Sequence, residues 1–133
     1  MTHMPPKSYH DLVVEAQEAI AFVSVADALD WQKTSKATFI DLRVLRELQK
    51  TGVIPEAHSC PRGLLEFWLD QSSPYAREIF GTGGSFVFYC DNGWRAALAT
   101  RLAGEMGLQQ AFCLDGGLDA WMSVGGPVVP YKW

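Results

Sequence analysis

Cys90 and Arg95 are the residues whose types and spacing most clearly indicate chemistry. Four residues, one of them Gly93, separate the thiol from the guanidinium, so the chain can curl and bring several backbone N–H groups and the cation to one sulfur. A lone cysteine behind an apolar segment is more commonly a buried packing residue, but this spacing favours a thiolate. A thiolate in such a setting is a nucleophile.

The elements that must position Cys90 follow from the apolar pattern on either side of it. Residues 85–89 form a short, mostly aromatic and β-branched run after a glycine-rich break, which predicts a buried parallel strand. Apolar residues recur at one-turn spacing over residues 94–106, which predicts a helix that ends at Gly107. Cys90 then lies at a strand-to-helix junction, where loop N–H groups, the helix dipole and Arg95 favour an anion.

The rest of the chain alternates predicted helices and strands. In chain order these are an amphipathic helix over residues 8–20, a helix from residue 24, a strand over 37–40, a helical turn over 44–50, a brief strand over 57–60, an apolar helical face over 64–69, a short helical segment over 74–80 and a strand over 111–114. Strands too short to be amphipathic that alternate with helices predict an α/β fold, with a parallel sheet covered on both faces.

Composition indicates a single globular domain over residues 1–133. The chain is 48% hydrophobic and 20% charged, which is enough apolar material for one core. Its net charge of −4 and the lack of any run of Lys or Arg exclude a nucleic-acid or anionic-membrane surface. No stretch has the length of a membrane span, and the first residues lack an apolar leader. We therefore expect a cytoplasmic protein.

The cysteines and histidines indicate neither a disulfide framework nor a metal site. Cys60, Cys90 and Cys113 are an odd number with no C-x-x-C pair, and the three histidines have no ligand spacing. We expect no metal and no organic cofactor. Cys60 and Cys113 are predicted to be packing residues rather than resolving thiols.

Several motifs, in order, resemble those of the rhodanese domain family from about Val23 to Val128. They are Ile40-Asp41-Leu42-Arg43 with Glu47, the segment from Gly52 to His58, Pro61-Arg62-Gly63, the loop from Cys90 to Arg95, Leu114-Asp115-Gly116-Gly117 with Ala120-Trp121, and Gly126-Pro127-Val128. The resemblance implies a five-stranded parallel sheet flanked by helices, with the Cys90 loop at its carboxyl edge. Residues 21–130 would form the core and residues 1–20 a helical extension.

The resemblance also implies a reaction. Cys90 would take a sulfane sulfur from thiosulfate or a persulfide donor, hold it as a persulfide, and pass it to cyanide or a thiol, as thiosulfate:cyanide sulfurtransferases do. A nucleophilic thiolate suits this chemistry. The partners would be a small-molecule donor and acceptor, or a protein that gives or receives sulfur.

Site residues around Cys90 are assigned on the same basis. The loop N–H groups would cradle the terminal sulfur and Arg95 would orient the loop; the loop residues are Asp91, Asn92, Gly93, Trp94, Arg95 and Ala96. Arg62 would line the pocket rim or form a surface salt bridge. Asp41 and Arg43 would brace loops through a salt bridge. Gly116 and Gly117 would permit a tight turn.

Two loop residues depart from the family's pattern. Family loops that handle thiosulfate commonly carry a cation directly after the cysteine, whereas Asp91 would repel a dianionic donor. Trp94 is bulkier than the usual residue, and would pack beneath the loop or wall the pocket mouth.

Three functions from different classes remain open. The first is a sulfurtransferase acting on small donors. The second is a persulfide carrier or interaction module in a protein sulfur relay, which Asp91 and Trp94 favour. The third is a phosphatase or arsenate reductase, whose similar loops hold five residues between cysteine and arginine, whereas four stand between Cys90 and Arg95.

Overall fold

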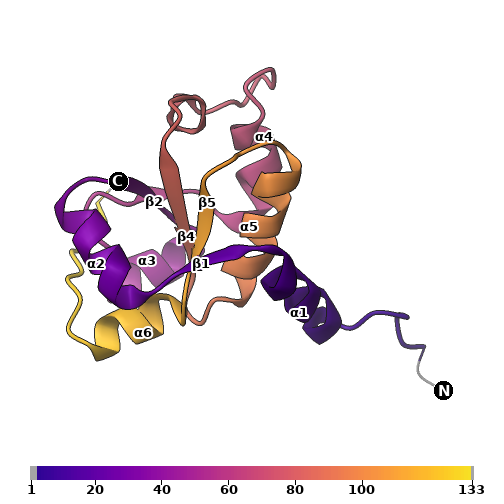
Figure 1. The fold of residues 1–133 in the computed structure, drawn as a ribbon, viewed down its shortest axis with the longest axis horizontal. Helices are drawn as coiled ribbons and strands as arrows, with labels where there is room; N and C mark the ends of the chain where they lie inside the picture. The colour runs from indigo at the N-terminus through magenta and orange to yellow at the C-terminus, as the bar shows by residue number, and fades with distance from the viewer. Residues whose placement is uncertain (1–2, 133) are drawn as a thin grey trace.

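The computed structural model describes residues 3–132 and contains a five-stranded sheet (Figure 1). In chain order the elements are α1 (Tyr9–Ala19), β1 (Ala21–Val23), α2 (Val25–Lys33), β2 (Ala37–Asp41), α3 (Leu45–Thr51), β3 (His58–Ser59), the 3-10 turn η1 (Arg62–Leu64), α4 (Leu65–Leu69), the 3-10 turn η2 (Glu78–Gly81), β4 (Ser85–Tyr89), α5 (Trp94–Glu105), β5 (Ala111–Leu114) and α6 (Gly117–Ser123). All strand pairs are parallel, in the order β1-β5-β4-β2-β3. The predicted α/β fold is confirmed.

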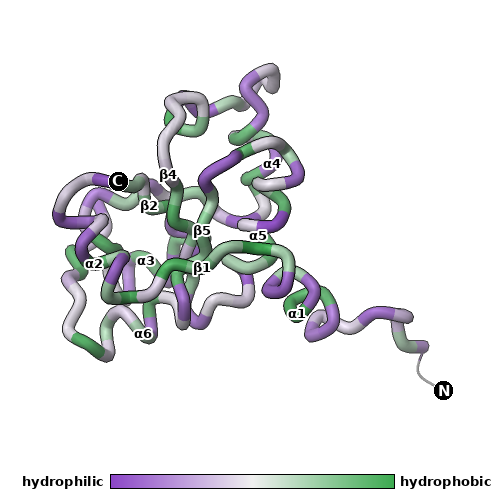
Figure 2. The backbone as a smooth tube through the Cα atoms, in the orientation of Figure 1, coloured by the Kyte–Doolittle hydropathy of each residue, from purple (hydrophilic) through white to green (hydrophobic). Residues whose placement is uncertain are grey.

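Two apolar clusters cover the two faces of the sheet. Side chains alternate along β4, so Phe86 and Phe88 pack with α4 and α5, while Val87 and Tyr89 pack with α2 and α6. Figure 2 shows the hydrophobic residues concentrated along the central strands. Burial on both faces explains why β4 has an apolar run rather than an alternating pattern.

The predicted N-terminal helix is present as α1 and packs on its own domain. Ser8 accepts a hydrogen bond from the Asp11 N–H at 3.0 Å, and Asp11 accepts one from the Ser8 N–H at 3.2 Å, which together form a capping box. Val13 and Ala16 are buried. Figure 1 shows α1 beside α5. The division into a core over residues 21–130 and an extension stays a prediction.

Three segments differ from the sequence-based expectation. The sequence predicts no element over residues 21–23, because three residues are too few to show a periodic hydrophobic pattern. In the structure they form the edge strand β1, which pairs with β5. The strand expected over residues 57–60 shortens to β3. The helical segment expected over residues 74–80 is wrong except for η2, because Asp70 and Ser73 side chains accept hydrogen bonds from nearby backbone N–H groups and favour turns.

The parallel arrangement brings the carboxyl ends of β2, β4 and β5 to one edge of the sheet. The segments that follow these strands lead into α3, α5 and α6. None of the helices within residues 3–132 has the length and apolarity needed to cross a bilayer.

Candidate active site

The loop after β4 holds Cys90 at the carboxyl edge of the sheet. Cys90 follows the last residue of β4, and it is completely buried, with 0% of its surface exposed. Gly93 has φ of 102°, a left-handed conformation that glycine adopts at no steric cost. In this conformation its N–H donates to Cys90 Sγ at 3.1 Å. The loop thus already directs a backbone donor at the sulfur, where it would stabilise a thiolate.

Fewer loop N–H groups are free to contact a bound sulfur than the sequence predicts. The Asn92 N–H donates to Asp91 Oδ1 at 2.8 Å, and the Trp94 N–H donates to Asn92 Oδ1 at 3.0 Å. These two donors are therefore occupied by loop side chains. The N–H groups of Arg95 and Ala96, in the first turn of α5, donate to no acceptor among the hydrogen bonds of residues 3–132. They are therefore open to a bound sulfur, next to the Gly93 N–H that already contacts Cys90 Sγ.

Arg95 lies in an ion-pair network that ties the loop to α3. Its guanidinium donates to Glu47 Oε1 at 2.7 Å and to Glu47 Oε2 at 2.9 Å, and also to Asp91 Oδ1 at 3.0 Å. The hydrogen bond with Glu47 raises the pKa of Arg95, and the same bond lowers the pKa of Glu47. Partial burial opposes ionisation of Asp91, but the hydrogen bond from Arg95 leaves its pKa below the ordinary value. The guanidinium therefore has carboxylate partners and positions the loop.

The buried pair of Asp41 and Arg43 supports the other end of α3. Arg43 Nη2 lies 2.8 Å from Asp41 Oδ2 and donates to the Gly52 carbonyl at 2.7 Å, while Nη1 donates to Thr51 Oγ1 at 2.7 Å. Because α3 also carries Glu47, this pair fixes the helix that holds Arg95. The expected mutual salt bridge is thus present in the structure.

The first turn of α6 clamps the loop from the other side. The N–H groups of Leu118 and Asp119 donate to the carbonyls of Cys90 and Asp91, each at 2.9 Å. A Cβ atom on Gly117 would lie 2.5 Å from the Asp91 carbonyl oxygen, so only glycine allows this approach. The sequence indicated a turn here; the clamp on the loop became visible only in the structure.

Trp94 extends towards α1 instead of packing beneath the loop. Its ring centroid lies 5.3 Å from that of Tyr9, with 46° between the planes. About half of Trp94 is exposed. Of the two expected positions, burial under the loop is therefore wrong, and the indole lies beside the loop with an aromatic neighbour.

Arg62 and Ala96 have different surroundings. Arg62 forms an ion pair with Glu66 at 3.1 Å, one helical turn away, and its backbone N–H donates to the carbonyl of Leu42, the residue directly after β2. Of the two positions expected for Arg62, the pocket rim and a surface salt bridge, the structure shows the salt bridge. Ala96 is buried, so it contributes its backbone N–H rather than a side chain.

The other two cysteines are buried thiols. Burial raises the pKa of Cys60 and of Cys113 to about 12. Cys113 Sγ lies 4.0 Å from the Gly93 carbonyl oxygen, so the sheet brings it beneath the loop, which sequence reasoning had no means to predict. Among residues 3–132, no three His, Cys, Asp or Glu side chains gather as a metal-ligand set.

Sequence reasoning missed Glu47 and Gly117 as parts of the site. Glu47 was visible only as a motif residue, since its partner Arg95 stands 48 residues later. Gly117 was visible only as half of a glycine pair. In each case the sequence showed that the residue belongs to a motif, but not which residue it contacts in the folded protein.

The family model for the rhodanese-like domain matches residues 24–124. No curated protein is similar enough to the chain to count as a match.

Among solved structures, three relatives cover most of the chain. A Rhodopseudomonas palustris protein of unknown function, named as a possible tyrosine phosphatase, is 40% identical with a TM-score of 0.93 over 97% of this chain and 99% of its own. The polysulfide-sulfur transferase homodimer of Wolinella succinogenes is 28% identical with a TM-score of 0.69 over 90% and 85%. The human single-domain sulfurtransferase TSTD1 is 25% identical with a TM-score of 0.67 over 77% and 95%.

Proposed function

Because this chain belongs to the rhodanese-like domain family, we propose that it is a sulfurtransferase that carries a sulfane sulfur as a persulfide on Cys90. The observation that carries the proposal is the contact of 3.1 Å between the Gly93 N–H and Cys90 Sγ. It directs a loop donor at a buried sulfur. The similarity to two sulfurtransferases supports the same reaction class.

The proposed reaction has two half-reactions. The Cys90 thiolate attacks the outer sulfur of thiosulfate or of a persulfide, the S–S bond of the donor breaks, and sulfite or a thiolate leaves. Cyanide or a thiol then takes the outer sulfur from Cys90, which leaves thiocyanate or a new persulfide and restores the thiolate. The reaction proposed here uses no metal or organic cofactor.

The chain's own residues have distinct roles in this proposal. The N–H groups of Gly93, Arg95 and Ala96 would hold the terminal sulfur of the persulfide. Glu47 and Asp91 hold the Arg95 side chain, so Arg95 positions the loop rather than binding the donor. The pair of Asp41 and Arg43 braces α3.

The second candidate, a persulfide carrier in a protein relay, is favoured by the charge of the loop. Arg95 is paired with two carboxylates, and Asp91 takes the position after the cysteine. A dianion such as thiosulfate therefore meets a carboxylate beside the nucleophile. This supports a persulfide donor over thiosulfate.

The phosphatase alternative is favoured by the name of the R. palustris structure alone. Two observations weigh against it. Four residues, rather than five, separate Cys90 from Arg95, and the Arg95 guanidinium contacts carboxylates. A phosphate ester would need that guanidinium for its own charge.

Intact-mass spectrometry of the unreduced protein tests the proposal. We expect thiosulfate or a low-molecular-weight persulfide to add the mass of one sulfur atom, and cyanide to remove it. Cys90→Ser should abolish the gain, because serine is nearly isosteric but cannot form a persulfide. Cys113→Ser, a buried thiol beneath the same loop, is the matched control and should still gain sulfur. A gain in Cys90→Ser, or turnover of aryl phosphate without any sulfur uptake, would contradict the proposal.

We also propose a reducing compartment, in agreement with the cytoplasmic location expected from the sequence. Cys60, Cys90 and Cys113 are all free and buried. A free nucleophilic thiol persists where thiols are kept reduced.

A further inference from the structure

Tyr9 of α1 and Trp94 of α5 form an exposed aromatic surface beside the Cys90 loop. Their centroids are 5.3 Å apart, and 63% of Tyr9 and 46% of Trp94 is exposed. Trp94 follows Gly93, whose N–H contacts Cys90 Sγ. Tyrosine and tryptophan are enriched at protein interfaces and dominate their binding energy. The mechanism proposed above does not use either ring.

The helix that carries Tyr9 is firmly attached although it lies outside residues 24–124, which match the family model. Its N-terminus is capped by Ser8 and Asp11, and Ala16 is fully buried. A rigid aromatic side chain loses little conformational freedom when a partner binds. Tyr9 is therefore held in place as part of a preorganised surface.

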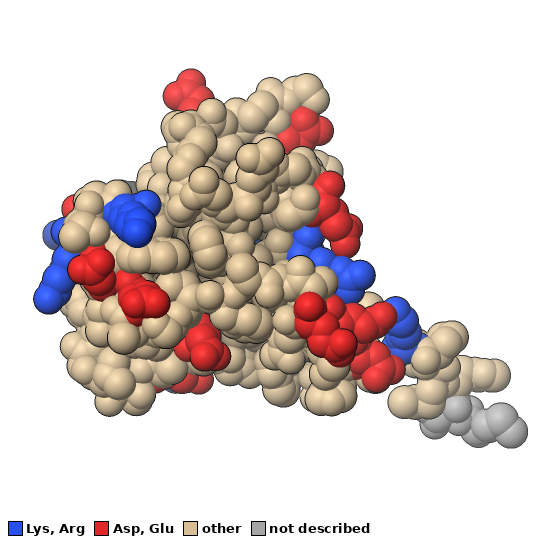
Figure 3. Space-filling model, viewed as in Figure 1, with Lys and Arg blue, Asp and Glu red and all other residues tan. Residues whose placement is uncertain are grey.

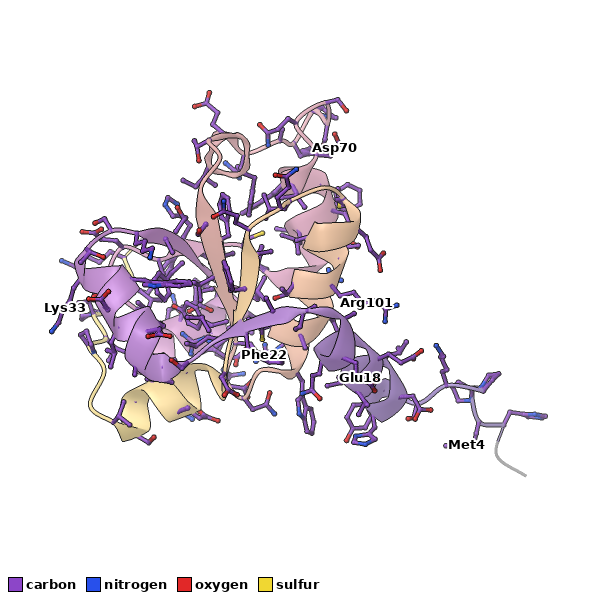
Figure 4. All side chains as sticks on the ribbon, in the orientation of Figure 1. Met4, Glu18, Phe22, Lys33, Asp70 and Arg101 are labelled. Carbon is purple, nitrogen blue, oxygen red and sulfur yellow. The ribbon has the colours of Figure 1, made fainter. Side chains whose placement is uncertain are left out.

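The charges around this surface determine which partner it fits. Asp91, Asp115 and Asp119 stand at the carboxyl edge, where the Leu114 carbonyl approaches Gly93 and the Asp119 N–H bonds to the loop. Figure 3 shows further carboxylates gathered over α1, with basic residues beside them, and Figure 4 labels Glu18 on this helix. Lys7, just before α1, is paired with Glu15.

Cations at the same edge are fewer. Arg43 and Arg95 are paired with carboxylates, and Arg46 is exposed on α3. A net negative edge attracts a basic partner and repels an acidic one.

The burial of Cys90 limits the shape of the donor. Because Sγ is covered, a sulfur donor has to reach it with a narrow, extended segment rather than with a flat face. A cysteine persulfide on a flexible loop or tail has this shape.

We propose that the Tyr9–Trp94 surface docks a basic, extended protein segment that carries a cysteine persulfide, and that this segment is the sulfur donor for Cys90. The proposal rests on the sulfurtransferase function above and specifies its donor. In the step, the Cys90 thiolate attacks the outer sulfur of the donor persulfide. The S–S bond of the donor breaks, its cysteine leaves as a thiolate, and the outer sulfur stays on Cys90 as a persulfide.

Three peptides of equal length test the donor. Each carries one cysteine persulfide, flanked by lysines, serines or glutamates, and the rate of sulfur loading onto Cys90 is followed by intact mass after rapid quenching. We expect the lysine peptide to load about tenfold faster than the serine peptide at low salt, and the glutamate peptide to load slowest. Half-molar salt should largely remove these differences, because it screens charges beyond a few ångströms.

Paired variants test the surface. Tyr9→Ala and Asp115→Lys should each slow loading from the lysine peptide about three- to tenfold, whereas Tyr9→Phe keeps the ring and should retain the rate. Tyr75→Ala removes another exposed tyrosine. Asp30→Lys makes the same charge change on α2, whose labelled Lys33 lies across the molecule from α1 in Figure 4. Both controls should load like the parent protein, and circular dichroism verifies folding.

Each other outcome is decisive. Equal rates for the three peptides, or a Tyr9→Ala variant that loads normally, would overturn the docking proposal while the sulfurtransferase function stands. Faster loading from glutathione persulfide than from any peptide would overturn it in favour of a small-molecule donor. Failure of every donor to load Cys90 would overturn the sulfurtransferase function itself.

Discussion

At the scale of single residues, the site depends on how charges are paired. Arg95 could serve as a cation for a donor anion, yet Glu47 and Asp91 occupy its guanidinium. Two parallel N–H···O bonds to Glu47 give a fixed geometry that lysine cannot reproduce. In the proposed mechanism Arg95 therefore acts through the shape of the loop and not as a direct partner of the donor anion.

Glu47→Gln is expected to slow sulfur loading of Cys90 several-fold and to change stability little. The amide weakens the grip on Arg95, so the loop N–H groups lose their fixed direction. Because the pair is about one-third exposed, the unfolding free energy should fall by only about 1 kcal/mol or less. Single-turnover loading with a persulfide donor and urea unfolding measure the two effects.

Glu105→Gln provides the matched control for Glu47→Gln. It breaks the ion pair of Glu105 with Arg101 near the C-terminal end of α5, far along the helix from the loop. This variant should keep the parent loading rate. Equal slowing in both variants would show that Glu47 has no specific role in positioning the loop.

At the scale of elements, three helices hold the Cys90 loop. Glu47 binds it from α3, the backbone of Leu118 and Asp119 binds it from α6, and Tyr9 of α1 contacts its tryptophan. The loop leads directly into α5, which begins at Trp94. Its conformation is therefore decided by the positions of helices that come from distant parts of the chain.

Gly117→Ala should destabilise the protein and abolish loading. The new Cβ would lie 2.5 Å from the Asp91 carbonyl oxygen, at a residue with φ of 64°. Backbone strain and the forced shift of the loop together should cost about 2 kcal/mol or more. Chemical denaturation and persulfide loading are the measurements.

Gly125→Ala separates these two causes. Gly125 also has positive φ, at 77°, but a Cβ there would meet no atom within 4 Å. It should cost only the strain of about 1 kcal/mol and leave loading intact. If Gly125→Ala proved as damaging as Gly117→Ala, close approach to the loop would not be the reason for the glycine.

At the scale of the whole molecule, buried thiols limit stability at high pH. Burial raises the pKa of Cys60 and Cys113 to about 12, whereas a thiol in the unfolded chain has a pKa of about 8.5. Between these values the unfolded chain loses protons that the folded protein keeps. Stability is therefore fully present below the unfolded pKa and is lost as pH rises toward the folded one.

The unfolding free energy should accordingly be level near neutral pH and fall from about pH 8.5 towards about pH 12. Urea titrations at closely spaced pH values measure this slope. The double variant Cys60→Ala/Cys113→Ala should be less stable at neutral pH, because it leaves small cavities, but should have a shallower alkaline slope. An unchanged slope would show that other groups, such as the buried Tyr89, cause the alkaline loss.

The sequence by itself determined the order of most elements and the α/β class, and it pointed to Cys90 as the proposed nucleophile. Those features depend on short-range information: an apolar run such as β4, helical spacing after Gly93, and a Cys90–Arg95 interval within one loop. Such patterns act between residues that are neighbours along the chain. Motif order then identified the family before any contact was known.

Only the tertiary structure decided which residues contact the Cys90 loop. The partner of Arg95 is 48 residues away, strand β1 exists only through pairing with β5, and Tyr9 meets Trp94 because α1 packs on α5. These contacts join segments that the strand order β1-β5-β4-β2-β3 brings together. The spacing of residues in the sequence does not encode that order, so the roles proposed for Glu47, Gly117 and Tyr9 depend on contacts seen only in the fold.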